Sequence, residues 1–229
     1  MFTVFTIRPS TSPNRQPRTS VRALTISIAV AGVLAGPVLP AQAAPARTQA
    51  DLPSSAVKCR GEGVDPTALV RYRTGVVINA PLSTIWNLQT DVERWPSWQP
   101  PVRTIERLDP GHLRKGSRFR WTTPAPATPT TPAVTLTITS TVRQLQSQNC
   151  VRWTGPAIGE GLRIDEGVHV WTFTKVKGGV RVQTEETWTG DQVEADVPTA
   201  TDALGEGLEE WLRNLKAAAE ARAGDRTIG

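Results

Sequence analysis

Two side chains in the sequence could exchange a proton near neutral pH if the fold brought them together. Histidine titrates close to neutral pH, and a carboxyl group does so when burial raises its pKa. His169 lies in the run VHVWTFT and Glu186 in the run VRVQTEETW, and both runs are typical of β-strands. Alternate side chains share one face of a strand, so His169 accompanies Trp171, and Glu186 accompanies Trp188. If the aromatic residues face inward, the histidine and the carboxyl do so too, as a candidate general acid and base.

Each of these residues also has a simpler interpretation. His169 could be a core histidine whose ring is satisfied by a neighbour, and Glu186 could lie on the surface of an edge strand. Arg120 and Arg152 could steady an enolate or a carboxylate only if a bulge turned one of them inward, because strand parity places both outside.

Other chemistries find little support in the sequence. The two histidines and two cysteines have no metal-ligand spacing, and no G-x-S-x-G motif is present. Three Gly-Glu-Gly tripeptides lack the third glycine of a dinucleotide-binding loop. We therefore expect no metal and no cofactor.

Residues 1–43 have the pattern of a Sec signal peptide. A basic segment without acidic residues is followed by the apolar run 23–39 and by Ala41-Gln42-Ala43, a typical cleavage site. The alternative is a membrane anchor, but the apolar run is shorter than the ~20 residues that span a bilayer. Cleavage would leave 186 residues with 22 basic and 21 acidic side chains, and a nucleic-acid binder would keep a larger positive excess. We expect a secreted protein with no stable membrane anchor after cleavage.

Cys59 and Cys150 are the only cysteines of the chain. In an oxidising compartment an even pair predicts one disulfide, and the alternative is two buried thiols.

The remaining chain predicts one α+β domain over residues 67–223, between a loose tail at 44–66 and a short tail at 224–229. A strand-like run, one or two short helices, about six more strands and a long helix follow one another. Strands joined by hairpins form an antiparallel sheet, of about seven strands in total here. If that sheet curls around the single long helix, a cavity can remain between them.

The final helix has a single apolar stripe, which predicts that Trp211 is mostly a core residue. Gly205 and Gly207 could delay the start of this helix or kink it. The stripe consists of Leu204, Leu208, Trp211, Leu212 and Leu215.

A low-complexity segment, residues 122–133, carries four prolines between two predicted strands. It could be a solvated, semi-rigid loop or a flap beside a ligand site.

The stretch INAPLSTIWNLQTDVERWPSWQPPV resembles the opening of the START/polyketide-cyclase (SRPBCC) superfamily, whose members have the helix-grip fold. Further similar stretches are GSRFRW, HVWTF, EETWTG and LEEWLRNLKAAAE, so the resemblance extends from about Val70 to Ala221. The superfamily includes aromatic polyketide cyclases, lipid and sterol carriers and hormone receptors, so the resemblance implies the fold and not one activity.

The resemblance also implies where a ligand would bind. The two short helices would close one end of the curled sheet, so that Trp95 and Trp98 either wall the cavity entrance or fill the end of the core. Such an aromatic lining suits a flat, apolar or aromatic ligand. The residues expected to line the cavity are Trp95, Trp98, Trp121, Trp153, Trp171, Phe173 and Trp188.

Two function classes follow, together with a weaker one. The chain could be a secreted binding protein for a lipid, isoprenoid or polyketide-like molecule, or a polyketide cyclase or dehydratase that transfers protons through His169 and Glu186. Export and the scarcity of inward titratable residues favour binding. An interaction protein with a filled core is the third alternative, and the sequence does not indicate an oligomeric state.

Overall fold

The computed structural model describes residues 56–128 and 131–225. The expected signal peptide and residues 44–55 of the expected tail lie outside the described residues. The elements in chain order are β1 (Val70–Ile78), α1 (Leu82–Thr90), the 3-10 helix η1 (Val92–Ser97), β2 (Thr104–Arg107), β3 (Arg118–Ala125), β4 (Val134–Gln146), β5 (Cys150–Gly159), β6 (Leu162–Val176), β7 (Gly179–Thr189), α2 (Asp191–Glu194) and α3 (Val197–Asp225).

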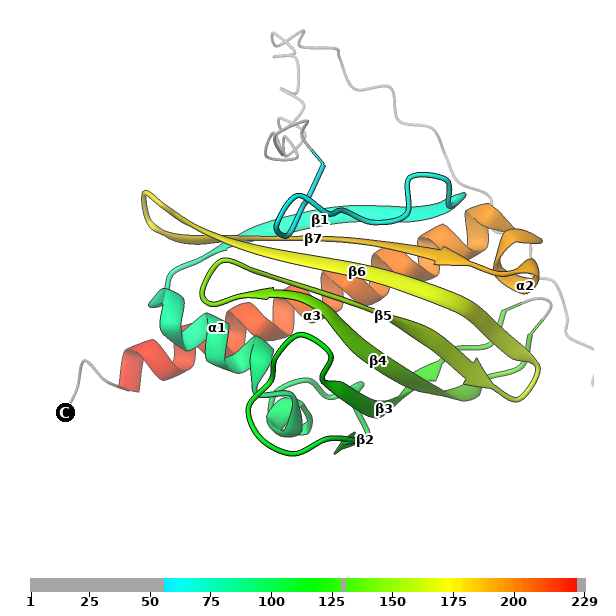
Figure 1. Ribbon diagram of the computed structural model, residues 1–229, viewed down its shortest axis with the longest axis horizontal. Coiled ribbons are helices and arrows are strands. Elements are labelled where there is room, and N and C mark those ends of the chain that lie inside the picture. Colours follow the sequence, from blue (N-terminus) through cyan, green and yellow to red (C-terminus); the bar gives the residue numbers. More distant parts are fainter. Residues whose placement is uncertain (1–55, 129–130, 226–229) are drawn as a thin grey trace, which may run out of the picture. The chain divides into compact units, whose positions relative to one another are not determined.

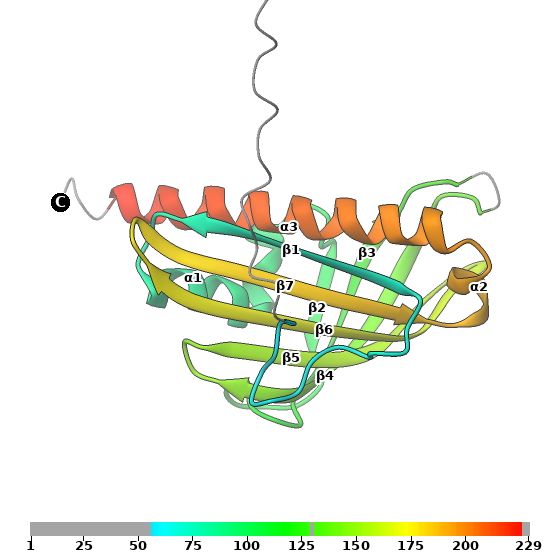
Figure 2. The ribbon, with the colours of Figure 1, turned by 90° about the horizontal axis from the view of Figure 1, so that it is seen from above.

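The strands form one antiparallel sheet of seven strands in the order β1-β7-β6-β5-β4-β3-β2. Strands β2 to β7 follow one another as neighbours, and β1 returns to pair with β7. The long helix α3 crosses the sheet on one side and packs most extensively on β1 (Figures 1 and 2). The expected fold class, a curled antiparallel sheet with a long C-terminal helix and two short helices after the first strand, is confirmed.

Two irregularities bend the sheet where β4, β5 and β6 pair. The register shifts between Val142 and Gln144 on β4 and between Gly155 and Ala157 on β5. A Cβ atom on Gly155 would lie 1.9 Å from the carbonyl oxygen of Thr139, so only glycine permits this close approach of β5 to β4. Bulges of this kind increase the local bend and twist of a strand, and here they help the sheet to curl.

Helix α3 is continuous from Val197, so its glycines neither delay nor kink it. A Cβ atom on Gly205 would lie 2.8 Å from the ring of Tyr72, so this glycine lets the helix rest directly on β1. The Tyr72 hydroxyl then donates a hydrogen bond to Glu209 on the same helix, at 2.6 Å. The five residues of the predicted apolar stripe, Leu204, Leu208, Trp211, Leu212 and Leu215, are all buried, and each leucine contributes about 2 kcal/mol through burial.

The residues VERWPS form η1, and Trp95 within this 3-10 helix is fully buried. Its ring makes edge-to-face contacts with Phe119, Trp121 and Trp211, with centroids 5.4, 5.8 and 4.9 Å away. Its Nε1 donates to the Gln89 carbonyl oxygen at 3.1 Å. Trp95 therefore fills the end of the core that lies under η1.

Residues 56–66 lie against the outer face of the sheet, and we call them the strap. The predicted disulfide between Cys59 and Cys150 is present, with a Cα–Cα distance of 5.3 Å. The backbone N–H of Val57 donates to Glu185 Oε2 at 2.9 Å, and Arg71 Nε donates to Glu185 Oε1 at 2.7 Å. Glu185 is only 1% exposed, so the strap and Arg71 together satisfy a buried carboxylate on the outer side of β7.

Replacing both cysteines, as Cys59→Ser and Cys150→Ser, should lower the free energy of unfolding by roughly 4 kcal/mol. The disulfide joins residues 91 positions apart, and removing it frees the unfolded chain. Urea unfolding followed by tryptophan fluorescence would measure the loss. Wild-type protein kept under reducing conditions is the control and should unfold like the double variant. An unchanged unfolding midpoint for the double variant would contradict this account.

Candidate functional site

A cavity of about 510 Å³ lies between the concave face of the sheet and α3. Because α3 packs mainly on β1, the inner faces of β3, β4 and β5 are left partly uncovered. The aromatic walls are Trp121, Trp153, Trp188 and Trp211, and aliphatic walls include Leu136, Ile138, Ala157, Ile164, Leu204 and Leu208. The polar groups that reach the cavity are Gln99, Thr123, Ser140, His169, Glu186, Glu206 and Glu210.

His169 and Glu186 are direct neighbours on β6 and β7. Nδ1 of His169 lies 3.0 Å from Oε2 of Glu186, and Trp188 Nε1 donates to Oε1 of Glu186 at 2.9 Å. Nε2 of His169 lies 2.7 Å from the Thr184 hydroxyl, which donates to the carbonyl oxygen of Val170 at 3.2 Å. A hydroxyl has only one proton, and Thr184 gives it to Val170, so Thr184 must accept a hydrogen bond from Nε2–H of His169. The contact between Nδ1 of His169 and Oε2 of Glu186 then holds a single proton.

Burial sets where that proton resides. Loss of solvent raises the pKa of Glu186 to about 7, although the hydrogen bond from Trp188 opposes the rise. Loss of solvent also lowers the pKa of His169, to about 3. Between these two values the imidazole is neutral and the Glu186 carboxyl is protonated, so the carboxyl donates to Nδ1 and the pair carries no net charge. The result is one exchangeable proton near neutral pH inside an apolar cavity.

The structure divides the residues expected to line the cavity into two groups. Trp121, Trp153 and Trp188 do line it, together with His169 and Glu186. The residues that are buried in the core and are not among the cavity walls are Trp95, Trp98, Trp171 and Phe173.

Strand parity was right for Trp171 and Phe173, because both side chains face inward. However, β6 is 15 residues long and the cavity meets it only at Ile164, Gly167 and His169. Towards the other end of the strand, α1 fills the interior, and Phe173 contacts Trp86 with centroids 5.4 Å apart.

Trp211 was expected to be mostly a core residue, but it also forms part of the cavity wall. Its place near Gly207 and Glu210, at the edge of the apolar stripe of α3, is the signal that could have revealed this position. The two arginines lie outside, as parity predicted. Arg120 is within 3.8 Å of Glu106, and Arg152 donates to the strap at Gly63.

The low-complexity segment lies beside the cavity. Its described ends contribute five lining residues, Thr123, Pro124, Ala125, Pro126 and Ala133. Ala203, Glu206 and Gly207 line the cavity from α3 and are exposed, so the cavity opens beside this helix and the β3–β4 segment. We call this opening the mouth.

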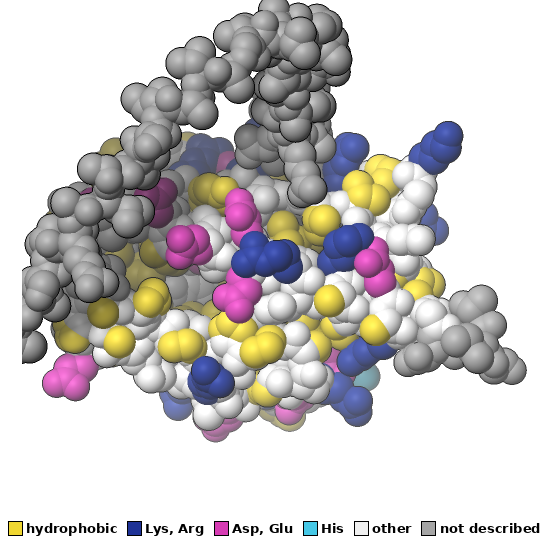
Figure 3. All heavy atoms as spheres, turned by 180° about the vertical axis from the view of Figure 1, so that it is seen from behind, with side chains coloured by type: hydrophobic (Ala, Val, Ile, Leu, Met, Phe, Trp, Pro, Cys, Tyr) yellow, Lys and Arg dark blue, Asp and Glu magenta, His cyan; other side chains and the backbone are white. Residues whose placement is uncertain are grey.

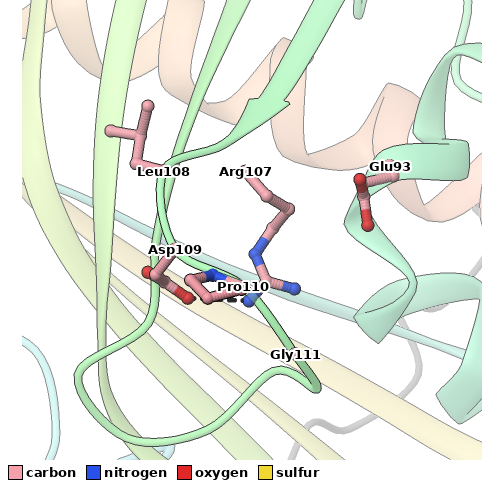
Figure 4. Close-up of a pocket in the computed structure, with 6 residues that line it drawn as sticks. All are labelled: Glu93, Arg107, Leu108, Asp109, Pro110 and Gly111. Atoms are coloured by element: carbon pink, nitrogen blue, oxygen red, sulfur yellow. Dashed lines mark hydrogen bonds and ion pairs between the residues drawn. The ribbon is translucent and has the colours of Figure 1, made fainter.

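A second hollow lies at the surface where β2 leads into β3, and Figure 4 shows its lining. Arg107 turns towards Asp109, with Nη2 and Oδ1 2.8 Å apart. The N–H of Arg118 donates to Asp109, and with the guanidinium of Arg107 it lowers the pKa of Asp109 to about 2. These charges stabilise the turn between β2 and β3.

The rest of the described chain shows no competing site. Residues 56–128 and 131–225 contain no group of three or more His, Cys, Asp and Glu side chains placed to hold a metal ion. No helix in those residues is long and apolar enough to cross a membrane. On the face shown in Figure 3, hydrophobic side chains are scattered among charged and polar ones. The cavity is therefore the candidate functional site.

An antiparallel sheet curled over one long C-terminal helix, with a cavity between them, defines the helix-grip class. Residues 69–220 match the family model described as "Polyketide cyclase / dehydrase and lipid transport", and the chain belongs to this family.

Several solved structures share the fold. The protein TTHA0849 from Thermus thermophilus is 20% identical with a TM-score of 0.52, and the match covers 67% of this chain and 99% of that one. The di-domain ARO/CYC StfQ from the steffimycin biosynthetic pathway is 18% identical with a TM-score of 0.52, covering 68% of this chain and 52% of that one. A START superfamily protein from Mycobacterium smegmatis is 14% identical with a TM-score of 0.50, covering 66% of this chain and 97% of that one. No curated protein sequence matches the chain.

The raised pKa of Glu186 should make stability depend on pH. The folded chain keeps a proton that the unfolded chain loses above its pKa of 4.5, so this contribution is present below pH 4.5 and is lost as pH rises to about 7. Glu186→Gln cannot ionise. Relative to this variant, wild-type protein should therefore lose up to about 3 kcal/mol of stability across that interval.

Urea unfolding from pH 4 to pH 8 would measure this difference. His169 gives the opposite trend, because its pKa is lowered, but it is present in both proteins and largely cancels. Parallel pH profiles for the two proteins would show that folding does not shift the pKa of Glu186, and would contradict this account.

Proposed function

We propose that the protein is secreted and binds an apolar or aromatic small molecule, such as a lipid, an isoprenoid or a polyketide-like compound, in its cavity. The observation that carries this proposal is a cavity of about 510 Å³ walled by four tryptophans and several aliphatic side chains. Cavities of about this size that are mostly apolar, with a few polar groups, are typical of sites for small organic ligands. The family description, which includes lipid transport, supports the same class of function.

The tryptophans suit a binding role for energetic reasons. A rigid indole offers a large apolar surface and loses little side-chain entropy when a ligand packs against it. Trp121 and Trp211 are also held by hydrogen bonds, to Ser140 Oγ at 3.2 Å and to Gln89 Oε1 at 3.0 Å. Walls fixed in this way reduce the ordering cost that binding would otherwise incur.

Secretion is supported by the leader-like residues 1–43 and by the disulfide, since disulfides persist in oxidising compartments. N-terminal sequencing of protein from the culture medium would test it, because the chain should then begin at or near Ala44.

A leucine at the mouth should block binding. Gly207 lines the cavity, and a Cβ atom built on it meets no atom within 4 Å. Gly207→Leu would place a side chain in this open space and should raise the Kd of the uncharged fluorescent probe N-phenyl-1-naphthylamine by about tenfold or more. The helix itself should gain stability, because leucine has a higher helix propensity than glycine.

Gly224→Leu is the matched control, since Gly224 also lies on α3 in open space but outside the cavity. Its affinity for the probe should equal that of wild type. Equal affinities for the Gly207 and Gly224 variants would place the probe outside the cavity.

The second candidate is a cyclase or dehydratase, and the His169–Glu186 pair favours it. Both ring nitrogens of His169 are engaged within the protein, by Glu186 and by Thr184. In this candidate the Glu186 carboxyl would deliver a proton to a ligand hydroxyl that leaves as water. The resulting carboxylate would take the hydrogen that the adjacent carbon loses as the C=C bond forms, so the carboxyl is regenerated. His169 would act as a positioning residue, because its Nδ1 holds the Glu186 carboxyl through the 3.0 Å contact.

For this candidate, dehydration of a β-hydroxyketone model substrate to its enone can be followed by absorbance. Glu186→Gln should lower turnover by about a hundredfold, the usual scale for losing a general acid. His169→Gln should leave ligand affinity within a few fold and also lower turnover, with a displaced pH profile. If Glu186→Gln converts the substrate at the wild-type rate, the pair has no part in the chemistry. If wild type converts none while the probe binds, binding alone remains.

A further inference from the structure

The charged and aromatic groups of the cavity are complementary to one kind of ligand. We propose that the ligand is an organic cation, with an apolar body inside the cavity and a protonated amine or quaternary ammonium group at the mouth beside Glu206 and Glu210. This inference rests on the proposed binding function and deepens it.

The first observation is the sign of the charges around the cavity. Apart from Glu186 in the neutral pair, two acidic residues line it, Glu206 and Glu210, and none of its described lining residues is a lysine or an arginine. The one histidine is kept neutral by burial, since its pKa is lowered to about 3. An anionic ligand such as a fatty acid would therefore find no positive charge to replace its hydration.

The second observation is how few hydrogen-bond donors the walls leave for a ligand. Three of the four wall indoles donate their Nε1–H within the protein, Trp121 to Ser140, Trp188 to Glu186 and Trp211 to Gln89. What these rings offer the cavity is their π surface, which packs well against the apolar body of a ligand. A carboxylate head group would find few donors there to replace the hydrogen bonds that it makes with water.

The third observation concerns the mouth itself. Glu206 and Glu210 are four residues apart on α3, so they lie on the same side of the helix. Like charges at this spacing destabilise a helix, and neither side chain forms an ion pair or hydrogen bond within the described part of the chain. By contrast, Glu209 between them bonds Tyr72 and lies within 3.9 Å of Arg213. A ligand cation at the mouth would supply the missing positive charge.

The arrangement also explains how a charged ligand could bind at low cost. Glu206 is exposed and Glu210 is half-buried, so an ammonium group there keeps part of its water shell. Only the apolar body needs to leave water and contact the tryptophans. This separation avoids the large penalty of burying an unpaired ion.

Three amphiphiles with the same chain and different head groups test the proposal. Isothermal titration calorimetry below the critical micelle concentration would compare dodecyltrimethylammonium, 1-dodecanol and dodecanoate. The cation should bind tightest and dodecanoate at least about tenfold more weakly. The double variant Glu206→Gln/Glu210→Gln should weaken cation binding by about fivefold, as expected for two exposed charge pairs, and leave dodecanol unchanged.

The matched control is Glu93→Gln/Glu160→Gln, which removes two exposed acidic groups outside the cavity. It should leave all three affinities unchanged, whereas Gly207→Leu should weaken binding of all three probes. Equal binding of cation and alcohol, or a preference for dodecanoate, would overturn the charge proposal while leaving cavity binding intact. If no probe binds, or if Gly207→Leu has no effect on any of them, the proposed binding function itself fails.

Discussion

The cavity depends on one packing constraint: a single helix cannot cover the whole concave face of a seven-stranded sheet. Helix α3 is held against β1 by Gly205, which lets the helix rest on the ring of Tyr72. The sheet meanwhile bends away at the β4–β5 bulge, where Gly155 permits the close approach of the two strands. Aromatic residues of η1 and α1 fill one end of the resulting space, and the other end stays hollow. Both glycines are therefore structural requirements for the cavity, and Gly155 also forms part of its wall.

The hollow end determines the electrostatics of the site. An apolar wall disfavours charge, so the neighbouring imidazole and carboxyl share one proton as a neutral pair. A neutral pair can lie against an apolar ligand without the penalty of a buried ion. The acidic groups that would keep their charge, Glu206 and Glu210, are on the helix at the mouth, where water remains. The neutral pair thus lies inside the cavity, and the charged carboxylates lie at its mouth.

Much of the fold could be predicted from the sequence, because alternation and the apolar stripe reflect local geometry. The period-two pattern placed His169 and Glu186 on inward faces, and two cysteines in a chain expected to be exported predicted the disulfide. The division of the inward aromatic residues between core and cavity could not be predicted. Parity says that Trp171 and Trp153 face inward, but only the position of α1 along β6 decides which of them meets empty space. Trp211 is a core residue as expected, but its second role as a cavity wall was missed for the same reason, since an apolar stripe does not reveal where the facing sheet bends away.

Strand β7 also separates the strap on the outer side of the sheet from the cavity on the inner side. Glu185 points outward and binds the backbone of the disulfide-anchored strap, while its neighbour Glu186 points inward and holds the proton of the cavity. Adjacent residues thus connect the strap, which the disulfide holds, to the wall of the cavity. Any free-energy coupling between them is reciprocal. If the intact disulfide strengthens ligand binding, then a bound ligand stabilises the disulfide against reduction by the same free energy. The resistance of the Cys59–Cys150 bond to reduction would then report whether the cavity is occupied.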